Sequence, residues 1–333
     1  MPHMSTTAIS AKAVSDLRKA SGAGMMDCKA ALAESNGDIE GAMDYLRKKG
    51  QKVAAKRADK ETTEGIVVAS ISPDGKRGQL IAISSETDFV AKNDAFIELV
   101  NTIAKTVFAS KATTKDEVNS LAFEGMTVGE KLISQTGVIG EKIEVSDIQT
   151  VTGENIASYI HAGSKIGVIV SYKVGEHPEA PTFFRSVAMH IAAMKPLILR
   201  PEEFDEEFVT KEAEALRAQI IAENETNARE NLGKPQKNVP SFASKRQLTP
   251  EVMAAAADAI KAELKAEGKP EKIWDKILPG KLDRYVADNT LLDQERCLLS
   301  QFFALDDTKT VEAAIKAFHP TAEVVEFKRV SVS

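Results

Sequence analysis

The sequence is poor in cysteine and has no long hydrophobic run. Its 333 residues include two cysteines, Cys28 and Cys297, which lie far apart and form no C-x-x-C motif. This usage argues against a disulfide scaffold and a zinc site, and we expect both thiols to be reduced and at least partly buried. No stretch approaches the ~20 apolar residues of a membrane-spanning helix, and the first residues lack the apolar run of a signal peptide. We therefore expect a cytoplasmic protein without membrane contact.

Motifs of catalysis and of nucleotide binding are also missing. The sequence contains no G-x-x-x-x-G-K-[S/T] phosphate loop, no G-x-S-x-G nucleophile motif and no H-E-x-x-H zinc motif. Its few histidines lack metal-ligand spacing, and His190, between apolar Met189 and Ile191, is typical of a histidine at the edge of a core. We expect no enzyme activity, no cofactor, no bound metal and no direct binding of a nucleotide.

The chain has no strong excess of charge. Its formal net charge is -6 at pH 7, which disfavours a dedicated DNA or RNA binder, because neutralising phosphates usually takes a basic domain or stripe. One basic run is the exception, with seven lysines and arginines in residues 47–60. Most such runs are solvated helix faces or linkers. An RNA- or ribosome-binding protein that uses the 47–60 segment is the alternative function.

Three short amphipathic helices are predicted in residues 9–50. Apolar residues recur at helical spacing in each of them, Gly37 follows the second, and Asp38 suits the N-cap of the third. Met25 and Met26 are adjacent, so on a helix they project about 100° apart and at least one faces outward. An exposed methionine favours an adaptable apolar contact, whereas two partly buried methionines are the alternative.

A pattern of two strands followed by a helix occurs twice in the central part of the chain. The predicted strands are 65–71 with 79–83 and 155–160 with 166–172, and the predicted helices are 94–110 and 183–194. Such a duplication indicates an α+β fold with two related sheet-plus-helix subdomains, each with helices on one face of its sheet.

Long charged helices are predicted after Pro201. Heptad spacing in 209–220 and again in 253–264 predicts that these two helices pair as an antiparallel hairpin, with Thr249 as an N-cap and Pro250 at the first helical position. A helix near 311–318 and a closing strand within 322–332 then complete the chain. A solvent-bridging arm and a docking or dimerising arm are equally open interpretations of the hairpin.

These patterns divide the chain into successive segments. We predict 1–8 as a disordered start or tag remnant, 9–50 as a helical module, 51–62 as a basic linker, 63–150 as a first core subdomain, 151–200 as a second core subdomain closed by 310–332, 201–270 as a helical hairpin arm, and 271–309 as a return segment.

The junction between a predicted strand and a predicted helix contains Thr87, Asp88, Phe89 and Val90. Asn93 suits the N-cap of that helix. An exposed Asp-Phe pair at such a junction serves recognition better than folding, so we interpret the segment as a protrusion aimed at a partner. By itself, the segment is equally compatible with Phe89 as a core residue and Asp88 as a turn former.

Several motifs together resemble the elongation factor Ts family, whose members promote nucleotide exchange on elongation factor Tu. They occur in the family's order: residues 17–18 with 21–32, 36–38, 87–93, 161–168 and 189–193. The resemblance is good over 9–200, weak after Pro270 and nearly absent from 215–265. It implies that 9–50 is similar to a ubiquitin-associated bundle and that 201–270 is a coiled-coil arm, longer here than is usual in the family.

The resemblance also implies a set of contacts with elongation factor Tu, in its GDP-bound and nucleotide-free forms. The implied contact residues are Thr87, Asp88, Phe89 and Val90 near the partner's Mg²⁺ site, Arg18, Met25 and Met26 on the helical module, and Ile166, Gly167 and His190 in the second subdomain. In the implied mechanism Phe89 enters an apolar crevice of the GTPase while Asp88 and its neighbours disturb the Mg²⁺ that retains GDP. A homodimer and a two-plus-two complex with elongation factor Tu are both compatible with the sequence.

Overall fold

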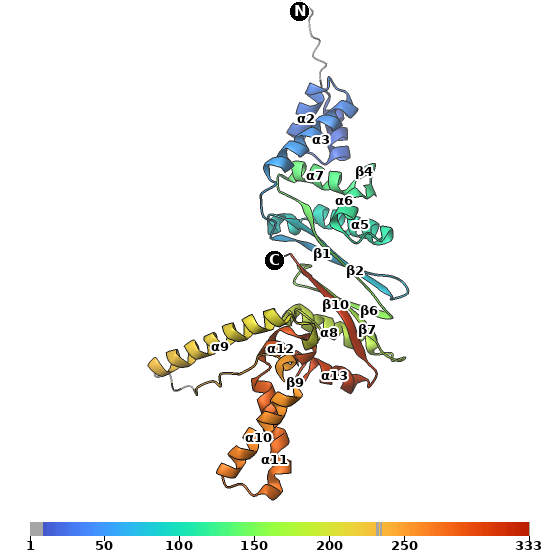
Figure 1. The fold of residues 1–333 in the computed structure, drawn as a ribbon. Helices are drawn as coiled ribbons and strands as arrows, with labels where there is room; N and C mark the ends of the chain where they lie inside the picture. Colours follow the sequence, from blue (N-terminus) through green and yellow to red (C-terminus); the bar gives the residue numbers. More distant parts are fainter. Residues whose placement is uncertain (1–8, 231–232, 234, 333) are drawn as a thin grey trace, which may run out of the picture. The chain divides into compact units, whose positions relative to one another are not determined.

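The computed structural model describes residues 9–230, 233 and 235–332, and the predicted disordered start at 1–8 lies outside them. The chain forms two compact units. The first extends through Ala192 and includes the last strand from Val324, and the second is Ala193–Glu323. Helices and strands occur in both units (Figure 1), which confirms the predicted α+β class.

A bundle of three helices opens the first unit: α1 (Ala11–Ser21), α2 (Met25–Glu34) and α3 (Ile39–Lys56). The predicted N-cap of α3 is confirmed, because the Asp38 side chain accepts the Gly41 N–H at 2.8 Å. Leu17, Cys28 and Leu32 are fully buried at the centre of the bundle.

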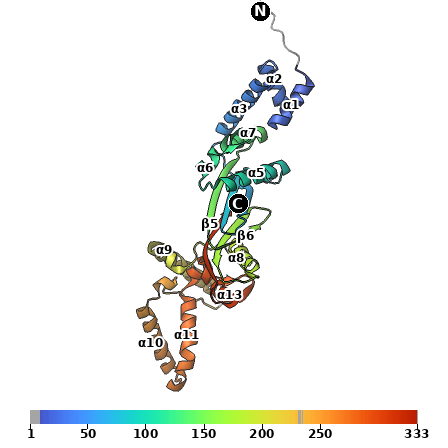
Figure 2. The same ribbon diagram turned by 90° about the vertical axis from the view of Figure 1, so that its right-hand side faces the viewer.

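The third helix is longer than predicted. It continues to Lys56, so the first half of the predicted basic linker at 51–62 is helical instead. The physical reason is that 51–56 contain no glycine or proline and consist mainly of good helix formers. α3 packs against α7, which lies next to it in both views (Figure 1, Figure 2).

The first sheet is antiparallel, with its strands in the order β1 (Glu64–Ile71), β2 (Arg77–Ser85) and β5 (Glu144–Thr152). Its side chains alternate between two cores. Ile66, Ile81 and Ile83 face the helices, whereas Val67 and Leu80 face the second sheet. The covering elements are α5 (Asp94–Ser110), α6 (Lys115–Ser120), the short strands β3 (Ala122–Phe123) and β4 (Met126–Thr127), and α7 (Val128–Ile139).

The second sheet contains β10 (Glu323–Ser331), β7 (Ile166–Lys173) and β6 (Asn155–His161) in that order, so the last strand joins this sheet as predicted. One of its faces packs on the first sheet through residues such as Ile156 and Ile169. α8 (Ala180–Met194) contributes Phe184, whose ring stacks on Tyr172 of β7 with 3.8 Å between centroids. The first unit is therefore layered, with two sheets back to back and helices outside them.

The second unit is mainly helical. Its elements are η1 (Pro201–Glu203), α9 (Glu206–Arg229), η2 (Lys245–Gln247), α10 (Pro250–Ala266), η3 (Glu271–Ile273), α11 (Trp274–Asp288), α12 (Leu291–Arg296), η4 (Leu298–Ser300), β8 (Phe302–Phe303), β9 (Asp306–Thr310) and α13 (Val311–Phe318). Phe204, Leu292 and Cys297 belong to its core. Both Cys28 and Cys297 are buried free thiols, as predicted.

The helical hairpin is real but pairs different helices from those predicted. α10 packs along α11, as both ribbon views show (Figure 1, Figure 2), so the predicted pairing of 209–220 with 253–264 is wrong. α9 buries Val209 and Ala213 against Phe204 and Leu292 instead. Heptad spacing shows that a helix needs a partner without identifying it, and α11 lay unrecognised in the predicted return segment 271–309.

Candidate partner-binding site

The junction between β2 and α5 forms a short exposed turn, residues 87–90, which we call the Phe89 turn. It opens the four-residue helix α4 (Asp88–Ala91), and Asn93 caps α5 as predicted by accepting the Ala95 and Phe96 N–H groups. Phe89 is 83% exposed, whereas Val90 is 8% exposed and belongs to the core under the first sheet. Phe89 is therefore not a core residue, and Val90 anchors the turn from beneath.

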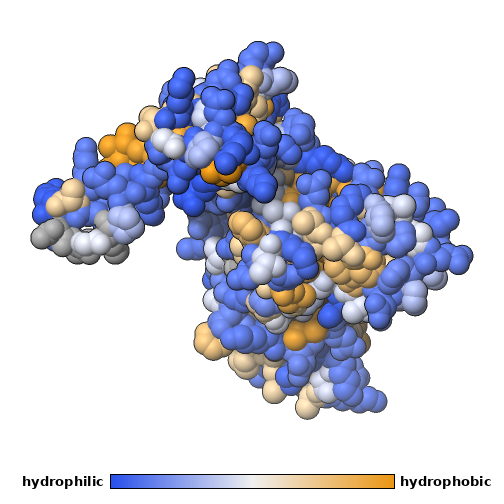
Figure 3. Space-filling view, turned by 90° about the horizontal axis from the view of Figure 1, so that it is seen from below, coloured by the Kyte–Doolittle hydropathy of each residue, from blue (hydrophilic) through white to orange (hydrophobic). Residues whose placement is uncertain are grey.

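Exposed apolar side chains are not rare in this protein. Viewed from below, the surface is mostly hydrophilic but carries several separate hydrophobic patches (Figure 3). What distinguishes Phe89 is its degree of exposure, because the next most exposed large hydrophobic residue in the described part of the chain, Met26, is 74% exposed. An aromatic ring that is exposed to this degree buries little area in the fold and so adds little to its stability, and its position favours a contact with another molecule.

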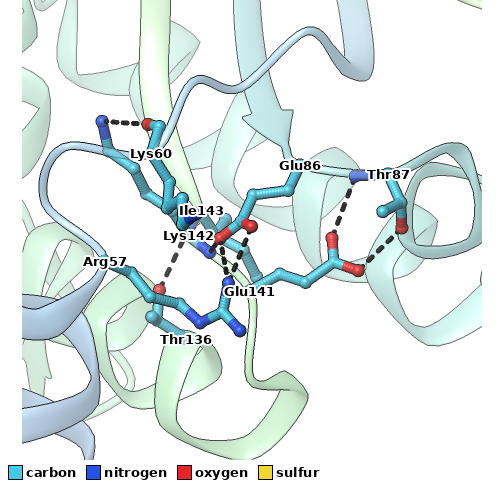
Figure 4. Close-up of polar contacts among 8 residues, drawn as sticks. All are labelled: Arg57, Lys60, Glu86, Thr87, Thr136, Glu141, Lys142 and Ile143. Atoms are coloured by element: carbon cyan, nitrogen blue, oxygen red, sulfur yellow. Dashed lines mark hydrogen bonds and ion pairs between the residues drawn. The ribbon is translucent and has the colours of Figure 1, made fainter.

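A carboxylate from a distant part of the sequence holds the start of the turn (Figure 4). Glu141, which follows α7, accepts the Thr87 N–H at 3.0 Å and the Thr87 hydroxyl at 2.7 Å. The Ser85 hydroxyl donates to the Thr87 carbonyl at 3.1 Å. Thr87 is thus fixed through three of its polar groups, and we infer that it shapes the turn.

The neighbouring carboxylate, Glu86, connects the turn to the bundle (Figure 4). It accepts the Lys142 N–H at 2.6 Å, and the Arg57 guanidinium lies 2.8 and 2.7 Å from its two oxygens. Burial by itself would raise the pKa of Glu86, but the Lys142 N–H and Arg57 together hold that pKa below its usual value. Glu86 is therefore ionised at neutral pH.

Asp88 is half-buried and ionised. Its carboxylate accepts a hydrogen bond from Lys92 at 2.6 Å, and this bond is the main reason why the pKa of Asp88 is lowered. The Lys92 side chain is 72% exposed, so the pair is a surface ion pair that a partner can replace at little cost.

A cavity of about 500 Å³ opens beside the turn. Phe89, Val90 and Phe96 line it on one side, and Val138 and Ile139 of α7 on the other. The lining is mainly apolar, so a partner that engages Phe89 also meets a hollow able to take an apolar side chain.

The methionines of the bundle are both exposed, Met25 at 60% and Met26 at 74%, so the prediction that at least one faces outward is confirmed. Arg18 of α1 is exposed as well. The bundle rests on α7 through a contact between two glycines: a Cβ added to Gly137 would lie 2.5 Å from the Gly50 Cα. Nothing in the local sequence pattern predicted this contact.

The contact residues expected in the second subdomain are less accessible. Ile166 is half-buried at the start of β7, and His190 on α8 is 1% exposed. Gly167 is buried where the two sheets approach, since an added Cβ would lie 2.6 Å from Val67 and 2.9 Å from Leu80. Both Gly167 and His190 are thus buried in this structure, where they take part in packing, and their contact with a partner stays a prediction.

The basic run at 47–60 is largely committed to ion pairs within the protein. Arg47 and Lys48 pair with Asp44, Lys49 with Asp27, and Arg57 with Glu86. Charges that are paired in this way contribute less to a continuous phosphate-binding surface, so the arrangement does not favour the RNA-binding alternative.

Within 9–230, 233 and 235–332, no group of three or more histidine, cysteine, aspartate or glutamate side chains is arranged to hold a metal ion. Over the same residues, every helix is too short or too polar to cross a membrane.

Comparison with known proteins supplies the family. The family model described as Elongation factor TS matches residues 86–333. The chain belongs to the elongation factor Ts family. It is 71% identical to the Elongation factor Ts of Rhodopirellula baltica over 98% of this chain and 100% of that protein. It is 47% identical to that of Flavobacterium johnsoniae (97% and 99% covered) and 45% identical to that of Campylobacter fetus (97% and 94% covered).

The match to the family model is shorter than the match to the relatives of this elongation factor Ts family member. The family model begins at Glu86, so it includes the Phe89 turn but not the bundle. The match to the Rhodopirellula protein extends over nearly the whole chain and so includes the bundle. Sequence motifs identified the Phe89 turn and the methionines, whereas Arg57, Glu86 and Glu141 carried no signal, because their partners are distant in sequence.

Proposed function

We infer that this chain is a guanine-nucleotide exchange factor that acts on elongation factor Tu during translation elongation. The observation that carries the inference within the family is Phe89, an aromatic ring that is 83% exposed on a turn held by hydrogen bonds. The factor works by binding and carries out no covalent chemistry. We expect it to act in the cytoplasm, where elongation factor Tu works.

Phe89 acts as a wedge in the partner's GTPase domain. A GTPase retains GDP through backbone groups around the phosphates and through a Mg²⁺ ion that neutralises phosphate charge. Insertion of the ring into an apolar crevice, with the Asp88 carboxylate beside it, displaces the groups that hold this ion. GDP then leaves because its phosphate charge is no longer neutralised.

Additional contacts anchor the wedge. Met25, Met26 and Arg18 present an adaptable apolar and cationic surface on the bundle. Ile166 supplies a further contact from the second sheet, and buried His190 supports that region from within. The complex with elongation factor Tu contains one copy of each protein or two of each, the latter through a homodimer of this chain.

Energetics explain why several contacts are needed. By thermodynamic linkage, if the factor weakens the binding of GDP to elongation factor Tu by some ratio, GDP weakens the binding of the factor by the same ratio. Each tenfold change in affinity corresponds to about 1.4 kcal/mol. Truncating a buried aromatic anchor typically removes about 2 to 4 kcal/mol of binding. Phe89 by itself therefore supplies about one and a half to three of these tenfold steps.

Release of a fluorescent GDP analogue from elongation factor Tu of the same organism tests this function. We expect the intact chain to accelerate release, and Phe89→Ala and the double variant Asp88→Ala, Phe89→Ala to lose roughly 30-fold or more of that acceleration. Circular dichroism should be unchanged, because both side chains lie largely outside the core.

Phe302→Ala is the matched control, since it removes a 51% exposed phenylalanine from the second unit and should leave release unchanged. Absence of acceleration by the intact chain would refute the exchange function. Salt-dependent binding of the chain to RNA without elongation factor Tu would then favour the alternative function.

A further inference from the structure

We propose that the ion pair between Glu86 and Arg57 couples the helical bundle to the Phe89 turn, so that Glu86 and Arg57 are positioning residues for nucleotide exchange. The proposal rests on the proposed function and adds residues that touch neither partner nor nucleotide. Phe89 contributes little packing of its own, being 83% exposed, so its direction is set by its neighbours in the chain, which include buried Val90. Two of these, Glu86 and Thr87, are held by side chains from elsewhere in the fold.

Arg57 is the C-cap of α3, directly after the last helical residue, and its backbone is therefore joined directly to the bundle. Its Nη1 atom donates to both carboxylate oxygens of Glu86, at 2.8 and 2.7 Å, across 29 positions of sequence. The Glu86 side chain is 16% exposed and that of Arg57 is 35% exposed. An ion pair that is mostly shielded from water is stronger and better defined than the surface pairs of this protein.

Glu86 also binds the segment that holds Thr87. It accepts the Lys142 N–H at 2.6 Å, while the preceding residue, Glu141, holds Thr87 at 2.7 Å (Figure 4). One carboxylate thus connects the end of α3, the start of the turn and the link between α7 and β5. Removing Arg57 leaves the Glu141 contacts in place but frees the bundle end of this connection.

The bundle has a second support, the close contact of Gly50 in α3 with Gly137 in α7. Val138 of α7 also packs against the core of the bundle, so α3 is seated on α7 by apolar contacts. The Arg57–Glu86 pair adds a polar contact at the C-terminal end of α3, beyond this apolar contact. With Arg57 in place, the methionines of the bundle and the ring of Phe89 meet the partner in a fixed relative geometry. Such preorganisation lets binding energy at one surface orient the other.

The test separates binding from orientation. Release of the fluorescent GDP analogue is measured over a range of factor concentrations, which gives a maximal rate and a half-saturating concentration. For Arg57→Met we expect the maximal rate to fall about tenfold, because a misplaced ring is less effective in the bound complex. The half-saturating concentration should change less than the maximal rate, because both contact surfaces remain present.

Lys48→Met is the matched control: it removes one positive charge from the same helix, at a side chain that is 67% exposed and pairs with Asp44. We expect it to behave like the unchanged chain. Arg57→Lys should recover most of the rate, because both contacts come from a single nitrogen that an ammonium group can replace. The double variant of Arg57→Met with Glu86→Gln should be no slower than the slower single variant, since the two residues act as one pair.

Equal maximal rates for Arg57→Met and Lys48→Met would overturn the coupling, as would a change confined to the half-saturating concentration. If Arg57→Met does not fold, the maximal rate of Glu86→Gln is compared with that of Lys48→Met instead, with the same expected and contradicting results. Lack of acceleration by the unchanged chain would instead refute the exchange function, so the two failures are distinguishable.

Discussion

At the scale of single residues, neighbouring side chains of the Phe89 turn have opposite tasks. Val90 is buried with Phe96 in the core and holds the turn in place, whereas Phe89 is exposed and available to a partner. Consecutive residues in a helical turn project about 100° apart, so Phe89 and Val90 point in different directions. At the start of α2, Met26 and Cys28 are two positions apart and project about 200° apart, and Met26 is exposed while Cys28 is buried.

The pKa values of two carboxylates that are shielded from water, Glu86 and Asp293, shift in opposite directions. At Glu86 the Lys142 N–H and the Arg57 guanidinium together outweigh burial, and the pKa is lowered. Asp293 in the second unit is 1% exposed, and burial raises its pKa above the usual 3.8 although the Ser244 side chain and the Lys245 N–H favour the ionised form. Desolvation prevails at Asp293 because this residue is more deeply buried than Glu86, whose side chain is 16% exposed.

This difference predicts how the second unit responds to pH. A raised folded-state pKa means that the Asp293 contribution is fully present below pH 3.8 and is lost as pH rises through the folded-state value. Relative to Asp293→Asn, which keeps an oxygen acceptor for the Lys245 N–H, the unchanged chain should lose stability across this window with a slope of up to about 1.4 kcal/mol per pH unit.

Denaturant unfolding of the second unit at several pH values measures the difference between the two chains. Asp258→Asn is the control, because the Asp258 side chain is 77% exposed on α10 and should give no such trend. A difference that stays constant with pH would contradict the assignment.

At the scale of secondary-structure elements, the crossing of α3 and α7 depends on the absence of two side chains. Gly137 lies so close to Gly50 that a Cβ on it would be 2.5 Å from the Gly50 Cα. Backbone atoms cannot rotate away as a side chain can, so the two helices would have to separate. Glycine at these positions lowers the intrinsic stability of each helix, but it allows the two helices to pack closely.

Gly137→Ala should accordingly destabilise the first unit by about 1 to 3 kcal/mol, the usual range for overpacking, despite a gain of up to about 1 kcal/mol in helix propensity. Gly280→Ala on α11 makes the same chemical change where an added Cβ would meet nothing within 4 Å, and should be stabilising. Urea unfolding of both variants measures the two signs. Stabilisation by both substitutions would show that the helices adjust freely.

At the scale of the whole molecule, the residues proposed to contact elongation factor Tu all belong to the first unit. They lie on the bundle, at the Phe89 turn and at the start of β7, and three apolar cores support them. The second unit has its own core around Phe204 and Cys297 and the α10–α11 hairpin. Its mainly helical fold contributes no residue to the proposed wedge.

Thermodynamic linkage between GDP and this chain predicts how strongly the chain binds each form of elongation factor Tu. The chain should bind nucleotide-free elongation factor Tu about 100-fold more tightly than the GDP-bound form, near the upper end of usual coupling energies. Phe89→Ala should lower this ratio, since the wedge and GDP compete for the same arrangement of the partner. Calorimetric titration of both forms gives the ratio, and a value near one for the unchanged chain would contradict exchange by this mechanism.

Features that depend on neighbours in the sequence could be predicted. The caps at Asp38, Asn93 and Thr249, the β1–β2 hairpin and the outward-facing methionines follow from short-range geometry, and all of them occur. The family motifs also identified the Phe89 turn, although its exposure, rather than burial of the ring, was decided by the fold.

The sequence by itself thus determined several helix caps, the class of fold and the family that the chain resembles. Tertiary structure alone decided that α10 pairs with α11, that His190 is buried, and that Arg57 reaches Glu86 across 29 positions. The physical reason is that an apolar stripe or a charge shows that a residue needs a partner, while the choice of partner depends on how distant elements pack.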